Sequence, residues 1–367
     1  MNITRASGFA AIIAAGAIVL SGCAANEPTG EAPDEPGAEA TVSGTLIGAG
    51  SSAQQSAMEA WTVGFQNLNP DATVEYDPIG SGGGRETFSG GGSQFAGTDR
   101  AFNDEELEAD QFAACVPGTG VVQLPTYISP IAVVFKLDGI ETLNMDAATI
   151  AGIFAGQITN WTDEAITSQN EGVELPDLPI TAVHRADDSG TTANFTDYLA
   201  AAAPDVWTVG PIETWPTEYG GEAAPQTSGV VDAVANGTGT IGYVDASRSE
   251  QFGVVSVKVG DEYVEYSPEA AAAIVDASPR VEGRGAGDLS IELDRASQEA
   301  GVYPIVLVSY QVACNEYQEG APVDLLKAFL SYIVTPEGQE LAATEAGSAP
   351  ISDALRAEAQ AAIDAIK

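Results

Sequence analysis

Residues 180–201 read Ile-Thr-Ala-Val-His-Arg-Ala-Asp-Asp-Ser-Gly-Thr-Thr-Ala-Asn-Phe-Thr-Asp-Tyr-Leu-Ala-Ala. The apolar run at 180–183 predicts a buried strand, and 191–201 predicts a helix with two apolar side chains four residues apart on one face. Arg185 and the run Ser189-Gly190-Thr191 lie between them. A helix that begins there offers unpaired N–H groups and the positive end of its dipole. This strand, loop and helix are typical of an α/β fold, and the loop suits a small dehydrated oxyanion.

Three other turns in the first 100 residues have a similar position. A Gly/Ser-rich turn at 48–52 follows an apolar run, a second one at 80–84 follows the strand predicted at 72–76, and Asp99 follows the strand predicted at 94–97. Ligands of open α/β sheets bind outside the carboxyl ends of the strands. We therefore expect these turns and the Arg185 loop to form one site.

Strands and helices continue to alternate along the chain. Further strands are predicted at 131–135, 240–244, 254–259 and 304–312, and further helices at 57–68, 147–154, 228–235, 322–333, 336–345 and 352–366. With 367 residues, of which 44% are hydrophobic, this alternation predicts two α/β domains. The C-terminal strand and helices are expected to return to the first domain.

The first 40 residues predict export and anchoring. The apolar run at 9–20 is too short to span a bilayer but suits the signal peptide that we predict at 1–22. Leu20-Ser21-Gly22-Cys23 looks like a lipobox, in which Cys23 is acylated (palmitate) and begins the mature chain. A chance cysteine after an ordinary signal peptide is the alternative. Acidic residues and prolines at 23–40 predict a disordered tether.

Two cysteines remain after Cys23, namely Cys115 and Cys314. An even number of cysteines in an oxidising compartment favours a disulfide, although two separately buried thiols are the alternative. A bridge would close a loop of roughly 200 residues and contribute about 5 kcal/mol in the chain-entropy model. It would also bring the C-terminal region beside the N-terminal one.

The charge of the chain excludes some partners. Against 53 acidic residues there are 13 Lys and Arg, and the formal net charge is −40. No basic patch is visible for nucleic acid or for an anionic lipid surface. The net charge does not decide the chemistry of one buried site, because salt screens diffuse surface charge over about 8–10 Å.

Two glycine-rich turns could also be interpreted as nucleotide-binding motifs. Gly48-x-Gly50-x-x-Ala53, with Glu75 closing the next strand, matches a dinucleotide-binding pattern, but an exported protein has no cytosolic nicotinamide pool. The turn at 80–84 lacks the Gly-Lys-Ser/Thr ending of a P-loop; a flexible linker is its other interpretation. We expect no cofactor.

Catalytic chemistry is also poorly supported. Asp188-Ser189-Gly190 superficially resembles a hydrolase nucleophile, which needs a histidine base within hydrogen-bond reach. His184 is the only histidine, five residues before Ser189 at the end of a strand. No zinc-ligand spacing is present. We predict no catalytic residue and no metal site. We expect His184 either to have a packing role or to contact a ligand-binding residue.

Several motifs together resemble one family in kind and in order. These are Gly48-Ala-Gly-Ser-Ser52, Ile79-Gly-Ser-Gly-Gly83, Phe95-Ala-Gly-Thr-Asp99, Ile153-Phe-Ala-Gly-Gln-Ile-Thr-Asn-Trp161, Arg185-Ala-Asp-Asp-Ser-Gly-Thr191 and Gly239-Thr-Ile-Gly-Tyr243. From about 44 to 360 the chain is similar to the phosphate-binding proteins of the high-affinity phosphate ABC transporter, the PstS family.

The resemblance implies a two-lobed periplasmic-binding-protein type II fold of the α/β class, with the ligand cleft between the lobes. Lobe I would comprise 41–127 and 301–367, and lobe II would comprise 128–300. Two crossover segments, near Tyr127 and near Gly301, would join the lobes. The resemblance would also account for a Cys115–Cys314 bridge within lobe I.

The family's ligand residues transfer to positions that match its motifs. Phosphate would be bound by hydroxyl and N–H groups, one guanidinium and one carboxylate of Ser52, Ala53, Ser81, Asp99, Arg185, Ser189, Gly190 and Thr191. Asp187 would hold the guanidinium of Arg185, or else be a solvated loop acid. Family members often have Thr-Phe where this chain has Ser52-Ala53, which keeps the hydroxyl and loses an aromatic neighbour.

Asp99 bears on specificity. An ionised carboxylate only accepts hydrogen bonds, so beside an anion it repels unless the ligand carries a proton. Phosphate carries one and sulfate does not, and an unpaired desolvated charge costs several kcal/mol. The alternative is that Asp99 caps a helix or lies at the surface.

These observations predict a monomeric, extracytoplasmic receptor that is lipid-anchored to the cell membrane. It would capture inorganic phosphate and deliver it to the permease subunits of an ABC transporter. A receptor for another oxyanion or an organic phosphate is one alternative. A secreted phosphatase or hydrolase, and an adhesin or sensor with the same fold, are the others.

Overall fold

The computed structural model describes residues 42–108 and 112–367. The signal peptide predicted at 1–22, Cys23 and the tether predicted at 23–40 lie outside the described residues. In the part of the chain that is described, no helix combines the length and the apolar character needed to cross a membrane.

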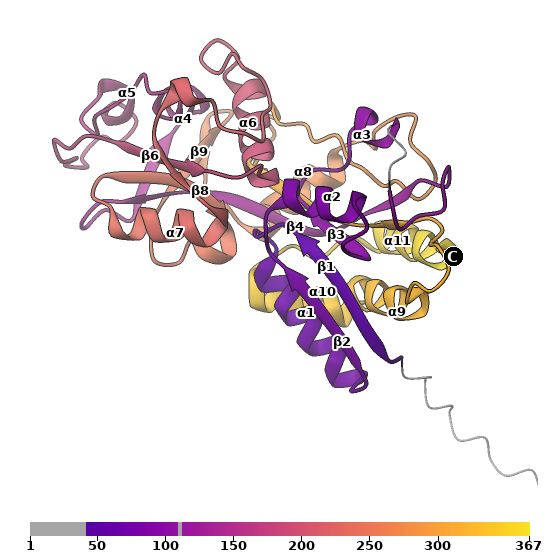
Figure 1. The fold of residues 1–367 in the computed structure, drawn as a ribbon. Coiled ribbons are helices and arrows are strands. Elements are labelled where there is room, and N and C mark those ends of the chain that lie inside the picture. Colours follow the sequence, from indigo (N-terminus) through magenta and orange to yellow (C-terminus); the bar gives the residue numbers. More distant parts are fainter. Residues whose placement is uncertain (1–41, 109–111) are drawn as a thin grey trace, which may run out of the picture. The chain divides into compact units, whose positions relative to one another are not determined.

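The strands form one continuous hydrogen-bonded path (Figure 1). Its order is β2 (Ala72–Asp77), β1 (Gly44–Gly50), β3 (Phe95–Thr98), β11 (Val306–Cys314), β4 (Val121–Lys136), β8 (Thr240–Asp245), β6 (Thr181–Arg185) and β7 (Glu222–Ala224). A second branch joins β9 (Gly253–Val259) to β4, β5 (Thr142–Met145) and β10 (Glu262–Val264). Strands β1, β2 and β3 are parallel, as are β6 and β8.

Strand β4 belongs to two groups of strands. Residues 121–130 pair with β11, whereas Ile131–Lys136 pair with β8. We call β1, β2, β3, β11 and residues 121–130 the first sheet, and residues 131–136 with β5–β10 the second sheet. The sequence predicts only 131–135 as a strand here. Pro125 and Pro130 lie inside β4, and a proline usually argues against a central strand.

Helices cover both sheets. The first sheet carries α1 (Gln55–Leu68), α2 (Ser81–Ser89), α9 (Val323–Val334), α10 (Pro336–Ala346) and α11 (Asp353–Ala365). The second sheet carries α4 (Ala147–Phe154), α6 (Gly190–Ala202) and α7 (Gln226–Asn236), and α8 (Pro268–Ala277) packs on β4. Two short helices, α3 (Asp104–Glu108) and α5 (Glu164–Thr167), lie in connections. The predicted helices agree with α1, α4, α6, α7 and α9–α11, and the α/β fold class is confirmed.

Aromatic side chains fill the core beneath both sheets. Trp61 of α1 meets Tyr127 of β4 edge-on at 6.3 Å between ring centroids. Under the second sheet, Phe195 of α6 stacks on Tyr243 of β8 at 4.3 Å, and Phe154 of α4 meets Phe195 at 4.8 Å. These contacts explain the apolar spacing on the helices, since each ring faces the sheet that its helix covers.

The segment at 279–291 follows α8 and lies along the first sheet. Leu289 N donates to Gln123 O at 3.0 Å, and Gln123 Nε2 donates to Asp288 Oδ2 at 2.7 Å. Arg280 forms an ion pair with Glu358 of α11 at 2.8 Å. This segment therefore bonds to the first part of β4 although its neighbours in sequence belong with the second sheet.

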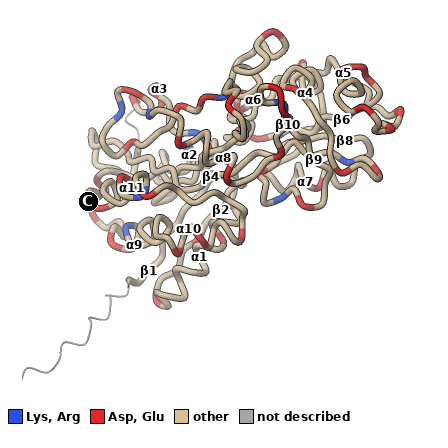
Figure 2. The backbone as a smooth tube through the Cα atoms, turned by 180° about the vertical axis from the view of Figure 1, so that it is seen from behind, with Lys and Arg blue, Asp and Glu red and all other residues tan. Residues whose placement is uncertain are grey.

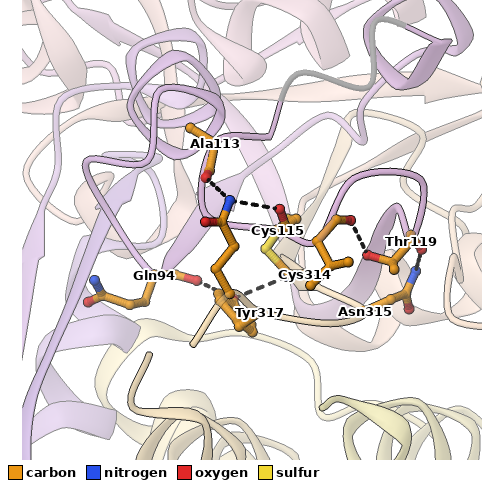
Figure 3. Close-up of a disulfide and its surroundings, with 9 residues drawn as sticks. Gln94, Ala113, Cys115, Thr119, Cys314, Asn315 and Tyr317 are labelled. Atoms are coloured by element: carbon orange, nitrogen blue, oxygen red, sulfur yellow. Dashed lines mark hydrogen bonds between the residues drawn. A yellow bond between two sulfur atoms is a disulfide. The ribbon is translucent and has the colours of Figure 1, made fainter. Parts of the chain in front are cut away.

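The predicted disulfide between Cys115 and Cys314 is confirmed (Figure 3). The two Cα atoms are 5.3 Å apart across 199 residues of chain. Cys314 is the last residue of β11, so the strand continues two residues beyond the predicted end at 312. Cys314 N donates to Tyr317 Oη at 3.1 Å, and this hydroxyl donates to Gln94 O. The bridge thus fastens the end of β11 to the segment before β4.

Candidate functional site

The first predicted turn is buried at the carboxyl end of β1. Ser51, Ser52 and Ala53 are each at most 5% exposed. Ala53 N donates to Ser51 Oγ at 3.1 Å. Ser52 Oγ lies 3.1 Å from Thr227 Oγ1 and accepts a hydrogen bond from Thr227 N, also at 3.1 Å. Because Thr227 belongs to α7, this turn of the first sheet is joined directly to a helix of the second.

The second turn places Ser81 at the start of α2. Ser81 Oγ accepts a hydrogen bond from Asp99 N at 3.1 Å. Gly80, with φ of +98°, caps α2, and a Cβ atom there would lie 2.4 Å from Asp187 Oδ2. Two observations favour glycine at position 80: its positive φ, which L side chains rarely adopt, and the close approach of the Asp187 carboxylate.

Asp99 is 3% exposed and follows β3. Its Oδ1 accepts a hydrogen bond from Ser309 Oγ at 2.6 Å, and its Oδ2 accepts one from Thr191 Oγ1 at 3.2 Å. Burial raises the pKa of Asp99 above its ordinary value, although the hydrogen bond from Ser309 and the charge of Arg185 oppose this. The carboxylate is thus a buried acceptor that contacts β11 on one side and α6 on the other.

Arg185 ends β6 and is 3% exposed. Its Nε donates to Asp187 Oδ1 at 2.9 Å, and its Nη2 donates to Asp187 Oδ2. Asp187 Oδ1 also accepts a hydrogen bond from Gln226 N at 2.8 Å. Burial would raise the pKa of Asp187, but the hydrogen bonds and charge of Arg185 outweigh it, so the pKa lies below the ordinary value. Asp187 holds the guanidinium in place and offsets part of its charge.

The first turn of α6 lies against Ser81 and Asp99. Ser189 caps the helix by accepting a hydrogen bond from Thr192 N at 3.2 Å. A Cβ atom on Gly190 would lie 2.6 Å from Ser81 Oγ and 2.8 Å from Asp99 Cβ. No side chain fits between the start of α6 and the first sheet.

The structure therefore brings the predicted residues into one cluster drawn from both sheets. Asp99 touches Ser81 and Thr191 directly, and Gly190 packs between them. Arg185 joins the cluster through Asp187, which lies against Gly80. Ser52 joins through Thr227, whose neighbour Gln226 bonds to Asp187. Hydroxyls, backbone N–H groups, the guanidinium of Arg185 paired with the carboxylate of Asp187, and the carboxylate of Asp99 are thus close together. This set suits a small oxyanion that carries a proton.

Three residues of this neighbourhood are absent from the sequence prediction: Thr227, Ser309 and Glu213. Thr227 is the second residue of α7, whose start follows Pro225. Ser309 is a polar residue inside the apolar run of β11, which is a weak signal for a buried role. Glu213 lies in an irregular segment, and its sequence gives no signal.

His184 stacks on Trp215 with ring centroids 4.7 Å apart and an interplanar angle of 11°. Its Nδ1 lies 2.9 Å from Arg185 O, and burial lowers its pKa. His184 thus contacts the indole ring of Trp215 and backbone atoms of Arg185 and Gly220. Among residues 42–108 and 112–367, no group of His, Cys, Asp and Glu side chains is arranged to hold a metal ion.

Comparisons with known proteins identify the family of the chain. Residues 35–337 match the model of the PBP superfamily domain. Phosphate-binding protein PstS2 of Mycobacterium bovis is 31% identical over 379 residues, and phosphate-binding protein PstS 3 of Mycobacterium leprae is 32% identical over 379 residues; both alignments cover 100% of each chain.

Solved structures give the same result for the fold. A phosphate-binding protein from Stenotrophomonas maltophilia superposes with a TM-score of 0.65 at 21% identity, covering 87% of this chain and 94% of the other. A putative phosphate ABC transporter substrate-binding protein with bound phosphate, from Clostridium perfringens, has a TM-score of 0.60 at 20% identity and covers 84% and 100%.

Proposed function

The chain belongs to the PstS family of phosphate-binding proteins, and on that premise we propose that it captures inorganic phosphate in the cluster around Asp99 and Arg185. The type II periplasmic-binding-protein fold predicted from the sequence is confirmed. Like its relatives, the protein is a binding protein and not an enzyme.

The proposed ligands are Ser52, Ala53, Ser81, Asp99, Arg185, Ser189, Gly190 and Thr191. The main support for the proposal is that Asp99, Arg185 and the first turn of α6 lie in one buried cluster. Arg185 offers a planar fork to two oxygens, and α6 offers its free N–H groups. Ser52 Oγ and Ala53 N–H now bond to Thr227 and Ser51, so phosphate would replace these partners.

Asp99 would select phosphate over sulfate. One of its oxygens accepts from Ser309 and the other from Thr191, and at 3% exposure the residue has little solvent to relieve repulsion from an anion. Protonated oxygen on phosphate would donate to Asp99, whereas sulfate has no proton to donate at neutral pH. Because burial raises the pKa of Asp99, the carboxyl would take up a proton as the pH falls, and the rejection of sulfate would weaken.

Calorimetric titration of the purified protein at pH 8 tests the proposal. We expect tight binding of phosphate and negligible heat with sulfate. Equal affinities for the two anions would refute the role of Asp99. The variant Asp99→Asn, which can donate a hydrogen bond, should bind sulfate measurably; if it still excludes sulfate, another group sets the specificity.

We also propose that Cys23 carries the lipid anchor and that the protein delivers phosphate to the permease of an ABC transporter. The lipobox at 20–23 and the family support this. Detergent phase partitioning of membranes tests the anchor, since Cys23→Ala should move the protein to the aqueous phase. Wild-type protein in the aqueous phase would contradict it.

The proposed lobes are 41–127 with 301–367 (lobe I) and 128–300 (lobe II). In support, β4 changes its partner at Ile131, close to the predicted crossover near Tyr127. The segment at 279–291 is an exception, because it bonds to Gln123 of the first sheet. Phosphate would draw the lobes together, since its ligands come from both.

A further inference from the structure

Four charged side chains form a second contact between the two sheets, beside the phosphate cluster. Arg85 of α2 donates through Nη2 to Glu213 Oε1 at 2.9 Å and Oε2 at 2.7 Å. Arg100 Nη2 donates to Glu213 Oε2 at 2.8 Å. Glu106 of α3 accepts from Arg85 Nε at 3.2 Å and from Arg100 Nη1 at 2.8 Å. Glu213 lies after α6, so it alone comes from the side of the second sheet.

The charges balance only when Glu213 is present. Arg85, Arg100 and Glu106 carry one net positive charge on the first-sheet side, and Glu213 cancels it. The side chains of Arg85 and Glu213 are 6% and 20% exposed. Without Glu213, Arg85 would still pair with Glu106, but the group would hold one uncompensated positive charge that is largely buried, which is costly. The first sheet therefore holds a preformed receptor for one carboxylate.

Three of the four members of this group, Arg85, Arg100 and Glu213, are tied to a proposed phosphate ligand. Arg85 lies one helical turn after Ser81 on the same face of α2. Arg100 directly follows Asp99. Glu213 O accepts a hydrogen bond from Ser189 N at 3.3 Å, so its backbone moves with the first turn of α6. A ligand that draws α6 toward Asp99 therefore also draws the backbone of Glu213 toward the two arginines.

We propose that Glu213 is a positioning residue that latches the two lobes together over bound phosphate and thereby slows its release. This inference rests on the proposed function. The latch makes no contact with the ligand. It adds a contact that exists only after closure, so it acts on the dissociation rate and leaves the encounter with phosphate almost unchanged.

Stopped-flow measurement of phosphate binding to the full protein tests the latch. Glu213→Gln keeps the size and an acceptor oxygen but removes the charge. We expect its phosphate dissociation rate and Kd to rise about tenfold, with an association rate within about twofold of wild type. The matched control is Glu218→Gln, an exposed glutamate in the same segment, which should behave as wild type.

A second variant tests the latch independently, in case Glu213→Gln does not fold. Arg100→Gln removes the more exposed arginine of the pair, 25% exposed, and should also speed dissociation. If Arg100 acts through Glu213, the double variant Glu213→Gln/Arg100→Gln should release phosphate at most slightly faster than Glu213→Gln alone. Circular dichroism and the thermal unfolding transition of each variant report folding independently.

The outcomes separate the latch from the proposed function. A wild-type dissociation rate in folded Glu213→Gln overturns the latch and leaves phosphate binding intact. Fully additive effects in the double variant overturn it as well. Absence of phosphate binding by the wild-type protein overturns the proposed function and, with it, the latch.

Discussion

Asp245 is a buried acid at the junction of the two sheets, and its surroundings change its pKa. The residue ends β8 opposite Ile131, where β4 changes partners, and it is fully buried. Its Oδ1 accepts hydrogen bonds from Tyr127 Oη at 3.0 Å and from Ser247 N at 3.0 Å. Within the described part of the chain, its Oδ2 has no partner. Burial raises its pKa to about 6, against the opposing effect of the hydrogen bonds from Ser247.

We predict that Asp245→Asn stabilises the protein at neutral pH. The folded-state pKa is raised from 3.8 to about 6, so the folded state holds a proton more tightly than the unfolded state. The stability from this proton is present below the unfolded pKa and is lost as the pH rises through about 6. Asparagine avoids that loss, keeps the Oδ1 acceptor, and should gain up to about 3 kcal/mol in free energy of unfolding at pH 8.

Urea denaturation of both proteins at several pH values measures this difference. The advantage of Asp245→Asn should grow between pH 4 and pH 8. If instead the free energy of unfolding of the variant falls relative to that of the wild type as the pH rises, the ionised carboxylate stabilises the fold. The variant Asp364→Asn, in the exposed part of α11, serves as a control for a change of one charge.

At the scale of elements, the start of α6 decides how closely the two sheets approach. Gly190 has an ordinary backbone conformation, so its lack of a side chain serves the contact with Ser81 and Asp99. The same helix turn carries Ser189 and Thr191, which are proposed to bind phosphate. Both the close approach of the two sheets and the proposed binding of phosphate therefore depend on Gly190.

We predict that Gly190→Ala folds normally but binds phosphate at least about tenfold more weakly, about 1.4 kcal/mol in binding free energy. The added methyl group would clash with Ser81 Oγ and Asp99 Cβ, which lie on the other side of the cleft. Separation of the lobes relieves this clash without unfolding either one. Calorimetry measures the affinity, and Gly285→Ala, where a Cβ atom would meet nothing within 4 Å, is the control. Wild-type affinity in Gly190→Ala would mean that phosphate is bound without this contact.

The disulfide acts on stability more than on binding. We predict that Cys115→Ala/Cys314→Ala lowers the free energy of unfolding by up to about 5 kcal/mol in the chain-entropy model, because the unfolded chain gains the freedom of a long loop. The bridge lies outside the phosphate cluster, so the Kd for phosphate should change less than about threefold, well under 1 kcal/mol. Urea denaturation with and without reductant checks both statements. Equal midpoints for oxidised and reduced wild-type protein would contradict the first.

Local sequence patterns predict those parts of the fold and the site that depend on neighbours in the chain. The Arg185 loop, the start of α6 and the position of Asp99 after a strand all follow from such patterns. Helix α8 also has a clear signal, a Ser267 cap followed by a proline, which the prediction does not include. These features are local because caps and strand ends are defined within a few residues.

Contacts between distant parts of the chain could not be predicted in this way. Ser309 is 210 residues from Asp99, Thr227 is 175 residues from Ser52, and Glu213 is 128 residues from Arg85. Each is an ordinary polar residue in its own segment and acquires its role only through the fold. The full length of β4 could not be predicted either, because its two prolines argue against a central strand. Pro125 lies beside the shift in register with β11, and Pro130 directly precedes the change of partner at Ile131.

On the scale of the whole molecule, the charge of the protein opposes the charge of its proposed ligand. The net charge is −40, and acidic residues occur on many elements whereas basic ones are few (Figure 2). Three of the arginines, Arg85, Arg100 and Arg185, are gathered near the proposed site. Phosphate must therefore cross a repulsive field to reach a short-range attractive site.

We predict that the association rate of phosphate rises several-fold when NaCl is increased from 10 to 150 mM. The screening length falls from about 30 Å to about 8 Å over this range, which removes the diffuse repulsion before it weakens contacts inside the site. Stopped-flow association rates measure the effect, and KCl at the same ionic strength controls for specific ion binding. A rate that falls with salt would show that the positive group of Arg85, Arg100 and Glu106 steers phosphate more strongly than the rest of the surface repels it. In that case Glu106→Gln, which makes the group more positive, should steepen the fall.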